Sequence, residues 1–218
     1  MSDVITVETA AQPDAAIIWM HGLGADGADF PPTLPYLLLP ESLKIRFLFP
    51  NAPVRPVTVN GGFEMRSWYD ITSMDNGREI NGHQLDESII RINKMVDDQI
   101  EQGIDDQRIL LVGFSQGGAV AYETGLQGSS SIGGIAAMST YLPRPLSSLA
   151  VTAATSLPVL ILHGTYDDVV PLTMAEEAKQ QLKQTGFDPE FYEYAMAHEV
   201  SVESLQTLGS WISQRLSK

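Results

Sequence analysis

The sequence predicts an α/β protein in which a mainly parallel central sheet carries helices on both faces. Short apolar runs rich in β-branched residues alternate with longer stretches of helical period, which is the pattern of repeated βαβ units. The apolar runs are continuous, as expected of strands that are covered on both faces. No repeat, charge block or low-complexity linker divides the 218 residues, so we predict a single domain over residues 1–218.

The individual elements follow in order from these runs. Six runs are predicted as strands, all in the interior of the sheet: residues 15–20, 45–49, 108–113, 132–138, 158–163 and 190–194. Four stretches are predicted as helices: residues 83–103, 117–126, 171–186 and 200–216. The first helix has the clearest signal, because apolar residues recur on one stripe from Leu85 to Ile100 and Gly103 ends the pattern.

Two stretches do not fit the alternation of strands and helices. Residues 30–40 are apolar but contain four prolines, and residues 51–82 form a long connection rich in Pro, Gly and Asn. Long loops are uncommon in compact domains and often line sites. We therefore put forward that one of these stretches forms a lid or an acyl-binding wall; the alternative for residues 37–39 is ordinary packing of a helix face.

Composition excludes several classes of function. The chain has no cysteine, which removes disulfides, thiolate nucleophiles and cysteine-ligated metals, so a nucleophile must come from another residue type. The formal charge of −14 disfavours nucleic acid and anionic membrane surfaces as partners. The N-terminus lacks the pattern of a signal peptide and no run is long enough to span a membrane, so we expect a soluble, cytoplasmic protein without stable membrane insertion.

The motif Gly113-Phe-Ser115-Gln-Gly117 matches G-x-S-x-G and lies between a predicted buried strand and a predicted helix. A sharp strand-to-helix turn needs small flanking residues and lifts the serine hydroxyl out of the sheet. The helix N-terminus then points at the hydroxyl, where its N–H groups favour a developing oxyanion. The motif alone also occurs by chance, but the strand before it and the glycine-rich helix start after it favour Ser115 as a nucleophile.

A serine hydroxyl needs a base to act as a nucleophile. In enzymes that carry the serine of G-x-S-x-G at a strand-to-helix turn, the serine comes first along the chain, the acid second and the histidine base last. His198 satisfies this order, since the other three histidines precede the serine or any suitable acid. Asp167 and Asp168 lie directly after a predicted strand, where the active sites of open α/β sheets are found. Either aspartate could orient His198, and spacing alone does not choose between them.

A second glycine-rich turn, from His21 to Gly27, follows the first predicted strand. In such a fold this loop presents one oxyanion-binding N–H and the residue after the nucleophile presents the other, which predicts Leu23 and Gln116. The turn does not match a phosphate-binding loop. We expect His21 to form structural hydrogen bonds. We do not expect it to bind a metal, because no second ligand stands at a suitable spacing.

Together these residues resemble the phospholipase/carboxylesterase family of α/β-hydrolases, which includes bacterial carboxylesterases and acyl-protein thioesterases. The resemblance covers nearly the whole chain, including residues 21–24, 50–58, 65–70, 113–118 and 163–171. It implies the α/β-hydrolase fold, no cofactor, and a serine carboxylesterase that cleaves short to medium acyl esters through an acyl-enzyme on Ser115. It also assigns Asp167 as the acid, and a homodimer is compatible with it.

The substrate and the pocket are less specified. The resemblance leaves acyl-protein thioesterase and lysophospholipase as alternatives, and a catalytically inert hydrolase-fold binding protein is the alternative from a different class. Trp68 is predicted to neighbour the site, with core packing as the competing interpretation. At residues 139–143 the chain departs from the animal thioesterases, which tend to carry a tryptophan there, so Tyr141 is predicted to alter the acyl pocket wall.

Overall fold

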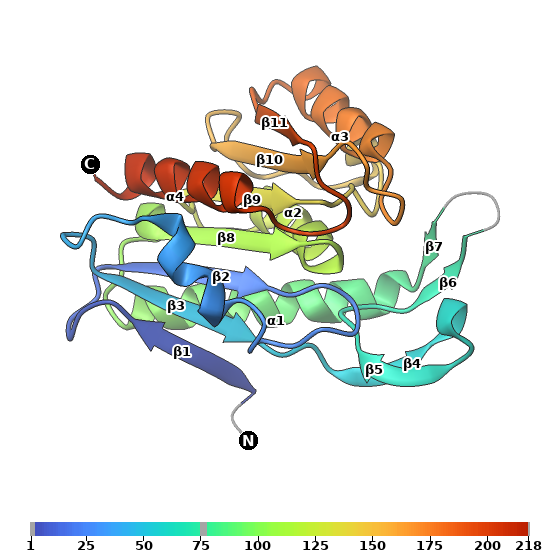
Figure 1. The fold of residues 1–218 in the computed structure, drawn as a ribbon, viewed down its shortest axis with the longest axis horizontal. Coiled ribbons are helices and arrows are strands. Elements are labelled where there is room, and N and C mark those ends of the chain that lie inside the picture. The colour runs from blue at the N-terminus through green and yellow to red at the C-terminus, as the bar shows by residue number, and fades with distance from the viewer. Residues whose placement is uncertain (1–2, 75–77, 218) are drawn as a thin grey trace.

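A computed structural model describes residues 3–74 and 78–217. Seven strands form the main sheet in the order β1-β3-β2-β8-β9-β10-β11, and only the β1–β3 pair within it is antiparallel. The strands are β1 (Val4–Glu8), β2 (Ala15–Met20), β3 (Ile45–Pro50), β8 (Ile109–Phe114), β9 (Gly134–Met138), β10 (Val159–Gly164) and β11 (Glu190–Tyr194). The parallel strands all point to the same end of the molecule (Figure 1), as the predicted fold class requires.

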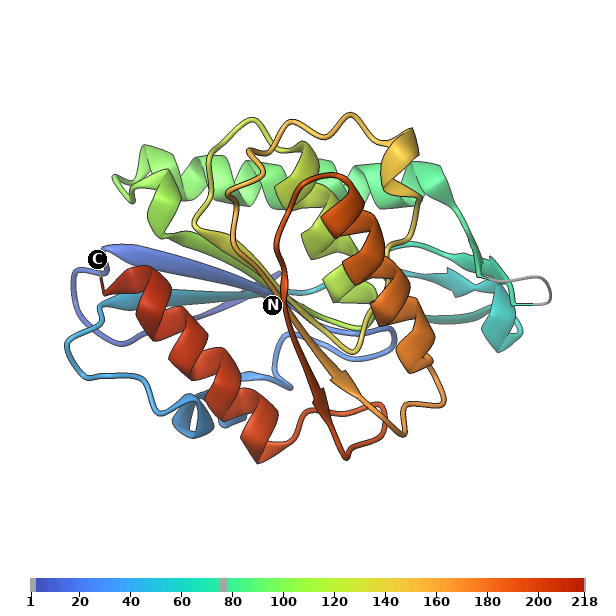
Figure 2. The same ribbon diagram turned by 90° about the horizontal axis from the view of Figure 1, so that it is seen from above.

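Helices cover both faces of this sheet (Figure 2). The four α-helices are α1 (Gly82–Glu101), α2 (Gln116–Gln127), α3 (Leu172–Gln184) and α4 (Val202–Leu216). Buried residues of α1, α2 and α3 share one apolar cluster, and those of α4 share the other with the 3₁₀ helix η1 (Pro31–Leu37). Short 3₁₀ turns are η2 (Thr58–Asn60), η3 (Asp106–Arg108) and η4 (Leu146–Ser148). No described helix is long and apolar enough to cross a membrane.

The central strands are buried on both sides, which explains why their sequences are continuously apolar. Successive side chains of β2 point to opposite faces, so Ile18 joins the cluster under α1–α3 while Ile17 joins the cluster under α4. Every residue of β2 and of β10 is buried. The two apolar clusters therefore hold the carboxyl ends of the central strands in fixed positions.

The prediction that all six strands lie in the interior is wrong for β11. This strand forms one edge of the sheet, and only Phe191 and Tyr194 are half-buried in it. Its sequence carries Glu190 and Glu193, which suit an edge that meets solvent. The other edge is β1, which the sequence did not reveal because a short alternating strand at an edge lacks the continuous apolar signal.

The stretch at residues 51–82 contains two hairpins, where the sequence predicts one long loop. They pair β4 (Val54–Val57) with β5 (Phe63–Arg66) and β6 (Ile71–Ser73) with β7 (Glu79–Ile80). Both extend from the end at which the parallel strands terminate (Figure 1). Residues 75–77 of the predicted lid stretch lie outside the described residues.

The proline-rich stretch at residues 30–40 forms η1, which packs against α4. Leu37 is buried in the cluster under α4, as the packing alternative predicts, whereas Leu38 is 70% exposed. Backbone approaches backbone closely here, since a Cβ on Gly209 of α4 would lie 1.8 Å from the Leu37 carbonyl oxygen. A lid formed by this stretch stays a prediction.

Candidate active site

Ser115 lies at the sharp turn between β8 and α2. Its backbone has φ 53° and ψ −122°, a conformation that costs energy for any residue with a Cβ. The flanking glycines are needed for close approach: a Cβ on Gly113 would lie 2.3 Å from the Gly117 oxygen, and one on Gly117 would lie 2.4 Å from the Met20 oxygen. The Ser115 N–H donates to the Met138 carbonyl at 2.9 Å, which fixes the turn against β9.

His198 connects the serine to an aspartate. Its Nε2 lies 2.9 Å from Ser115 Oγ and its Nδ1 lies 2.7 Å from Asp167 Oδ2. Asp167 follows β10 and His198 lies in the loop between β11 and α4, so the three side chains come from three different strand ends. Asp168, the alternative that spacing left open, is exposed and makes no ion pair with His198.

The carboxylate of Asp167 is fully buried and held by its own loop. Its Oδ1 accepts the backbone N–H groups of Val169 at 3.0 Å and Val170 at 2.7 Å, which leaves Oδ2 to face His198. His163 donates from Nε2 to the Val170 carbonyl at 2.8 Å, and that nitrogen lies 3.6 Å from Asp167 Oδ2. Burial lowers the pKa of His163 and so favours its neutral form.

Two backbone N–H groups beside the serine have no acceptor among the described residues. They belong to Leu23, in the turn after β2, and to Gln116, the first residue of α2, and both residues line the cleft that contains Ser115. N–H groups in the first turn of a helix lack partners within the helix and carry partial positive charge. The arrangement therefore offers two donors to an oxygen that develops negative charge.

The side chain of Gln116 has a role that the sequence did not indicate. Its Oε1 accepts the Trp68 N–H at 2.8 Å and its Nε2 donates to the Tyr69 carbonyl at 2.6 Å. The indole of Trp68 donates to the His21 carbonyl at 2.9 Å. Through these two hydrogen bonds, Trp68 connects the segments that carry the Leu23 and Gln116 amides. Its side chain is fully buried and is not among the residues that line the cleft.

His21 connects the turn after β2 to the segment that follows β3. Its Nε2 accepts the Ala52 N–H at 3.0 Å and its Nδ1 lies 2.7 Å from the Gly22 carbonyl, which accepts its proton. Burial lowers the pKa of His21. These contacts match the predicted hydrogen-bonding role, and no group of three or more metal-ligating side chains occurs within residues 3–74 and 78–217.

The cleft over Ser115 has a volume of about 340 Å³. Leu23, Ile71 and Tyr141 give it apolar walls. The hydroxyl groups of Tyr141 and Tyr69 lie 2.6 Å apart, and burial raises the pKa of Tyr69 well above its ordinary value. Tyr141 thus lines the cleft with its hydroxyl held in the protein, and its effect on the acyl pocket stays a prediction.

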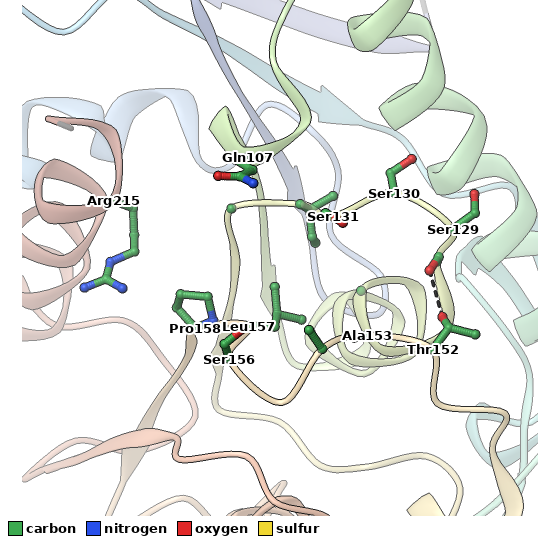
Figure 3. A pocket seen from close by; sticks show the side chains of 15 residues that line it. Gln107, Ser129, Ser130, Ser131, Thr152, Ala153, Ser156, Leu157, Pro158 and Arg215 are labelled. Atoms are coloured by element: carbon green, nitrogen blue, oxygen red, sulfur yellow. Dashed lines mark hydrogen bonds between the residues drawn. The ribbon is translucent and has the colours of Figure 1, made fainter.

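A second cavity of about 300 Å³ lies at the opposite end of the sheet, where β8, β9 and β10 begin. Its wall includes Ser129, Ser130 and Ser131 (Figure 3), and Thr152 donates to the Gly128 carbonyl at 2.8 Å. The lining contains no histidine, aspartate or glutamate among the described residues. Hydroxyl groups without a base do not form a nucleophile at neutral pH.

Comparison with known proteins identifies the family. The sequence model of the family described as phospholipase/carboxylesterase matches residues 2–216. The chain belongs to this family. Acyl-protein thioesterase 1 homolog 1 of Dictyostelium discoideum is 35% identical over 207 residues, which cover 94% of this chain and 92% of that protein. Carboxylesterase SOBER1 of Arabidopsis thaliana is 32% identical and covers 92% of this chain and 90% of its own length.

Solved structures of the family agree with the fold. The crystal structure of Arabidopsis thaliana SOBER1 matches with a TM-score of 0.86 and covers 93% of this chain and 99% of that chain at 32% identity. The crystal structure of Zea mays acyl-protein thioesterase 2 has a TM-score of 0.83 at 23% identity and shows the shared fold alone. The predicted α/β-hydrolase fold and the predicted class of ester hydrolase are thus confirmed. These names give no support to an inert binding protein.

Proposed function

We propose that Ser115, His198 and Asp167 form the catalytic triad of a serine carboxylesterase that cleaves short to medium acyl esters. The observation that carries the proposal is the continuous chain of contacts from Asp167 Oδ2 to His198 at 2.7 Å and from His198 to Ser115 Oγ at 2.9 Å. Both distances suit hydrogen bonds, and a base oriented by a carboxylate can activate a serine hydroxyl.

In the first half of the reaction, Ser115 Oγ attacks the acyl carbonyl carbon and its proton passes to His198 Nε2. The carbonyl oxygen becomes an oxyanion, which the N–H groups of Leu23 and Gln116 stabilise. Asp167 keeps the Nδ1 proton of His198 in place and stabilises the imidazolium. The imidazolium then gives its proton to the leaving alcohol, and the acyl group remains on Ser115 as an ester.

In the second half, a water molecule replaces the alcohol. It gives a proton to His198 Nε2 as its oxygen attacks the acyl-enzyme carbonyl, and the same two amides bind the oxyanion. The C–O bond to Ser115 breaks, the serine regains its proton from His198, and the carboxylic acid leaves. Each proton that His198 accepts is returned, so the reaction needs no cofactor.

The cleft supports substrates of limited size. A volume of about 340 Å³, with Leu23, Ile71 and Tyr141 in its wall, suits a short to medium acyl chain. The relative at 35% identity is named as an acyl-protein thioesterase, which favours a thioester substrate as the second candidate. Lysophospholipid stays a prediction from the family resemblance.

The proposal is tested by steady-state and burst kinetics on 4-nitrophenyl esters with acyl chains of increasing length, together with matched thioesters. We expect saturable hydrolysis with a burst of one nitrophenol per active site when deacylation is slow, and a fall in kcat/KM for long chains. Absence of hydrolysis across the whole series would contradict the proposal. Equal or faster turnover of thioesters would shift it to the second candidate.

We further propose that residues 1–218 act as one domain, because one sheet receives strands from both ends of the chain. A cytoplasmic location and a homodimer remain parts of the proposal that rest on composition and family resemblance. Light scattering coupled to size-exclusion chromatography measures the oligomeric state. With a formal charge of −14, the chain is expected to show no affinity for nucleic acid.

A further inference from the structure

Arg78 places a permanent positive charge in the wall of the cleft that contains Ser115 and His198. No carboxylate is among the described residues that line this cleft, and no other lysine or arginine is among them. The chain as a whole carries 27 acidic and 13 basic residues, so an average stretch of its surface would be anionic. Among the described residues, the lining of the cleft therefore carries a net positive charge, whereas the chain as a whole is acidic.

The guanidinium of Arg78 is fixed in position by two neighbours. Its Nη2 donates to the Val169 carbonyl at 3.1 Å, in the loop that also carries Asp167. Its central carbon lies 4.2 Å from the centroid of the Tyr141 ring, within the range of a cation–π contact. Because the Tyr141 hydroxyl is itself bonded to Tyr69, the ring beneath the guanidinium is held in place.

Arg78 makes few hydrogen bonds to the part of the chain that the structure describes. A guanidinium has five N–H donors, and only the bond to Val169 is made to a described residue. Its Nε is buried without a partner there, and no described carboxylate lies within 4.0 Å of the group. Arg144 shows the usual arrangement, since it pairs with both Asp86 and Glu123. A half-buried guanidinium normally has an anionic partner of this kind.

We propose that Arg78 forms a subsite for a carboxylate on the substrate, so that the enzyme favours esters with a second, anionic group beyond the scissile bond. This proposal rests on the proposed function of Ser115. A guanidinium presents N–H groups in a planar fork that matches a carboxylate, and the buried Nε of Arg78 has no partner among the described residues. The acyl chain and the leaving alcohol are the two places on an ester that can carry this carboxylate, and the experiment separates them.

The test compares kcat/KM for matched anionic and neutral esters. 4-Nitrophenyl hydrogen adipate and 4-nitrophenyl hexanoate differ by a carboxylate on the acyl chain, and 4-carboxyphenyl and 4-carbamoylphenyl hexanoate differ by one on the leaving group. In Arg78→Gln we expect the anionic-to-neutral ratio of at least one pair to fall by about ten- to hundredfold, as for a lost charge-assisted hydrogen bond. The neutral ester of each pair is the reference within the same variant, so an effect of Arg78→Gln on the ester chemistry itself cancels in the ratio.

Two further variants control for charge and folding. Arg215→Gln removes the same charge at the second cavity and should leave both ratios unchanged. Arg78→Lys keeps the charge and should retain part of the preference, so it remains informative if Arg78→Gln does not fold. The subsite is overturned if both ratios in Arg78→Gln stay within twofold of the parent, or if Arg215→Gln lowers them equally. If the parent enzyme does not hydrolyse 4-nitrophenyl hexanoate at all, the proposed function of Ser115 is contradicted instead.

Discussion

The two hollows at opposite ends of the sheet are similar in size and different in chemistry. The cleft at the carboxyl ends of the strands has about 340 Å³ and the cavity at the amino ends has about 300 Å³. Both have serine hydroxyl groups in their walls. Only the first brings a serine within 2.9 Å of an imidazole that a buried carboxylate orients.

The position of a serine with an oriented base therefore depends on the direction of the strands and not on the size of the cavity. The strained turn at Ser115, the loop of Asp167 and the loop of His198 all leave the carboxyl ends of parallel strands, β8, β10 and β11. The loops at the amino ends supply Ser129, Ser130 and Ser131 but no base. A reactive serine therefore requires the elbow and its partners together.

Removal of a serine hydroxyl is expected to give the largest difference in enzyme activity between the two hollows. Ser115→Ala should lower kcat/KM for a 4-nitrophenyl ester by about 10⁴- to 10⁶-fold, because the triad acts as a unit. Ser130→Ala, at the second cavity, is the matched control and should leave kcat/KM within twofold. Thermal unfolding of both variants should stay close to that of the parent. Comparable losses of activity in the two variants would contradict the distinction.

The neighbouring pair Asp167 and Asp168 gives the next largest effect. Asp167→Asn should lower kcat by about 10³- to 10⁴-fold, because an amide cannot stabilise the imidazolium of His198 or hold its proton on Nδ1. Asp168 is exposed, and Asp168→Asn should leave kcat within about twofold. Steady-state kinetics on one ester measures both. A larger loss in Asp168→Asn would exchange the two assignments.

Removal of the Gln116 side chain tests how the active-site end is held together. In Gln116→Ala the Trp68 N–H and the Tyr69 carbonyl lose their buried partner, which should cost about 1–3 kcal/mol of unfolding free energy. We also expect kcat/KM to fall by about ten- to hundredfold, because the nearby Leu23 and Gln116 amides must stay aligned. Gln107→Ala, at the second cavity, is the control for chemical denaturation and kinetics.

The smallest effect concerns stability against pH. Burial lowers the folded-state pKa of His163 below 6.5, so the unfolded state binds the proton more readily. The stabilisation is fully present above about pH 6.5 and is lost as the pH falls below that value, by at most about 1.4 kcal/mol per pH unit. His163→Gln should therefore flatten the fall in unfolding free energy between pH 7.5 and 5.5.

The control for this prediction is His83→Gln, at a position whose side chain is 83% exposed. Urea denaturation at both pH values gives the unfolding free energies. A slope in His163→Gln equal to that of the parent would show that His163 does not contribute to the acid sensitivity.

Much of the fold could be predicted because the central strands are covered on both faces. Their runs are continuously apolar, and the predicted bounds of the strand at residues 15–20 agree with β2. The edge strands could not be recognised in the same way. Solvent covers one of their sides, so β1 alternates and β11 includes two glutamates. The hairpins at residues 54–80 were missed because short strands between glycines and prolines lack a clear period.

The candidate site could be predicted from the sequence where its chemistry depends on chain order and backbone geometry. Sequence patterns indicate the glycines around Ser115, the order of serine, acid and base, and the positions of the two amides. The roles of Trp68, the Gln116 side chain and Arg78 depend on contacts between residues far apart in the chain, such as the 2.9 Å bond from Trp68 to the His21 carbonyl. No local pattern predicts such contacts.

Covalent labelling tests the central claim most directly. A fluorophosphonate reacts only with an activated serine, and mass spectrometry of the digested protein locates the adduct. We predict a single adduct on Ser115, absent in His198→Ala and present in Ser130→Ala. An unlabelled parent enzyme, or an adduct on Ser129, Ser130 or Ser131, would contradict the assignment of the active site to the carboxyl end of the sheet.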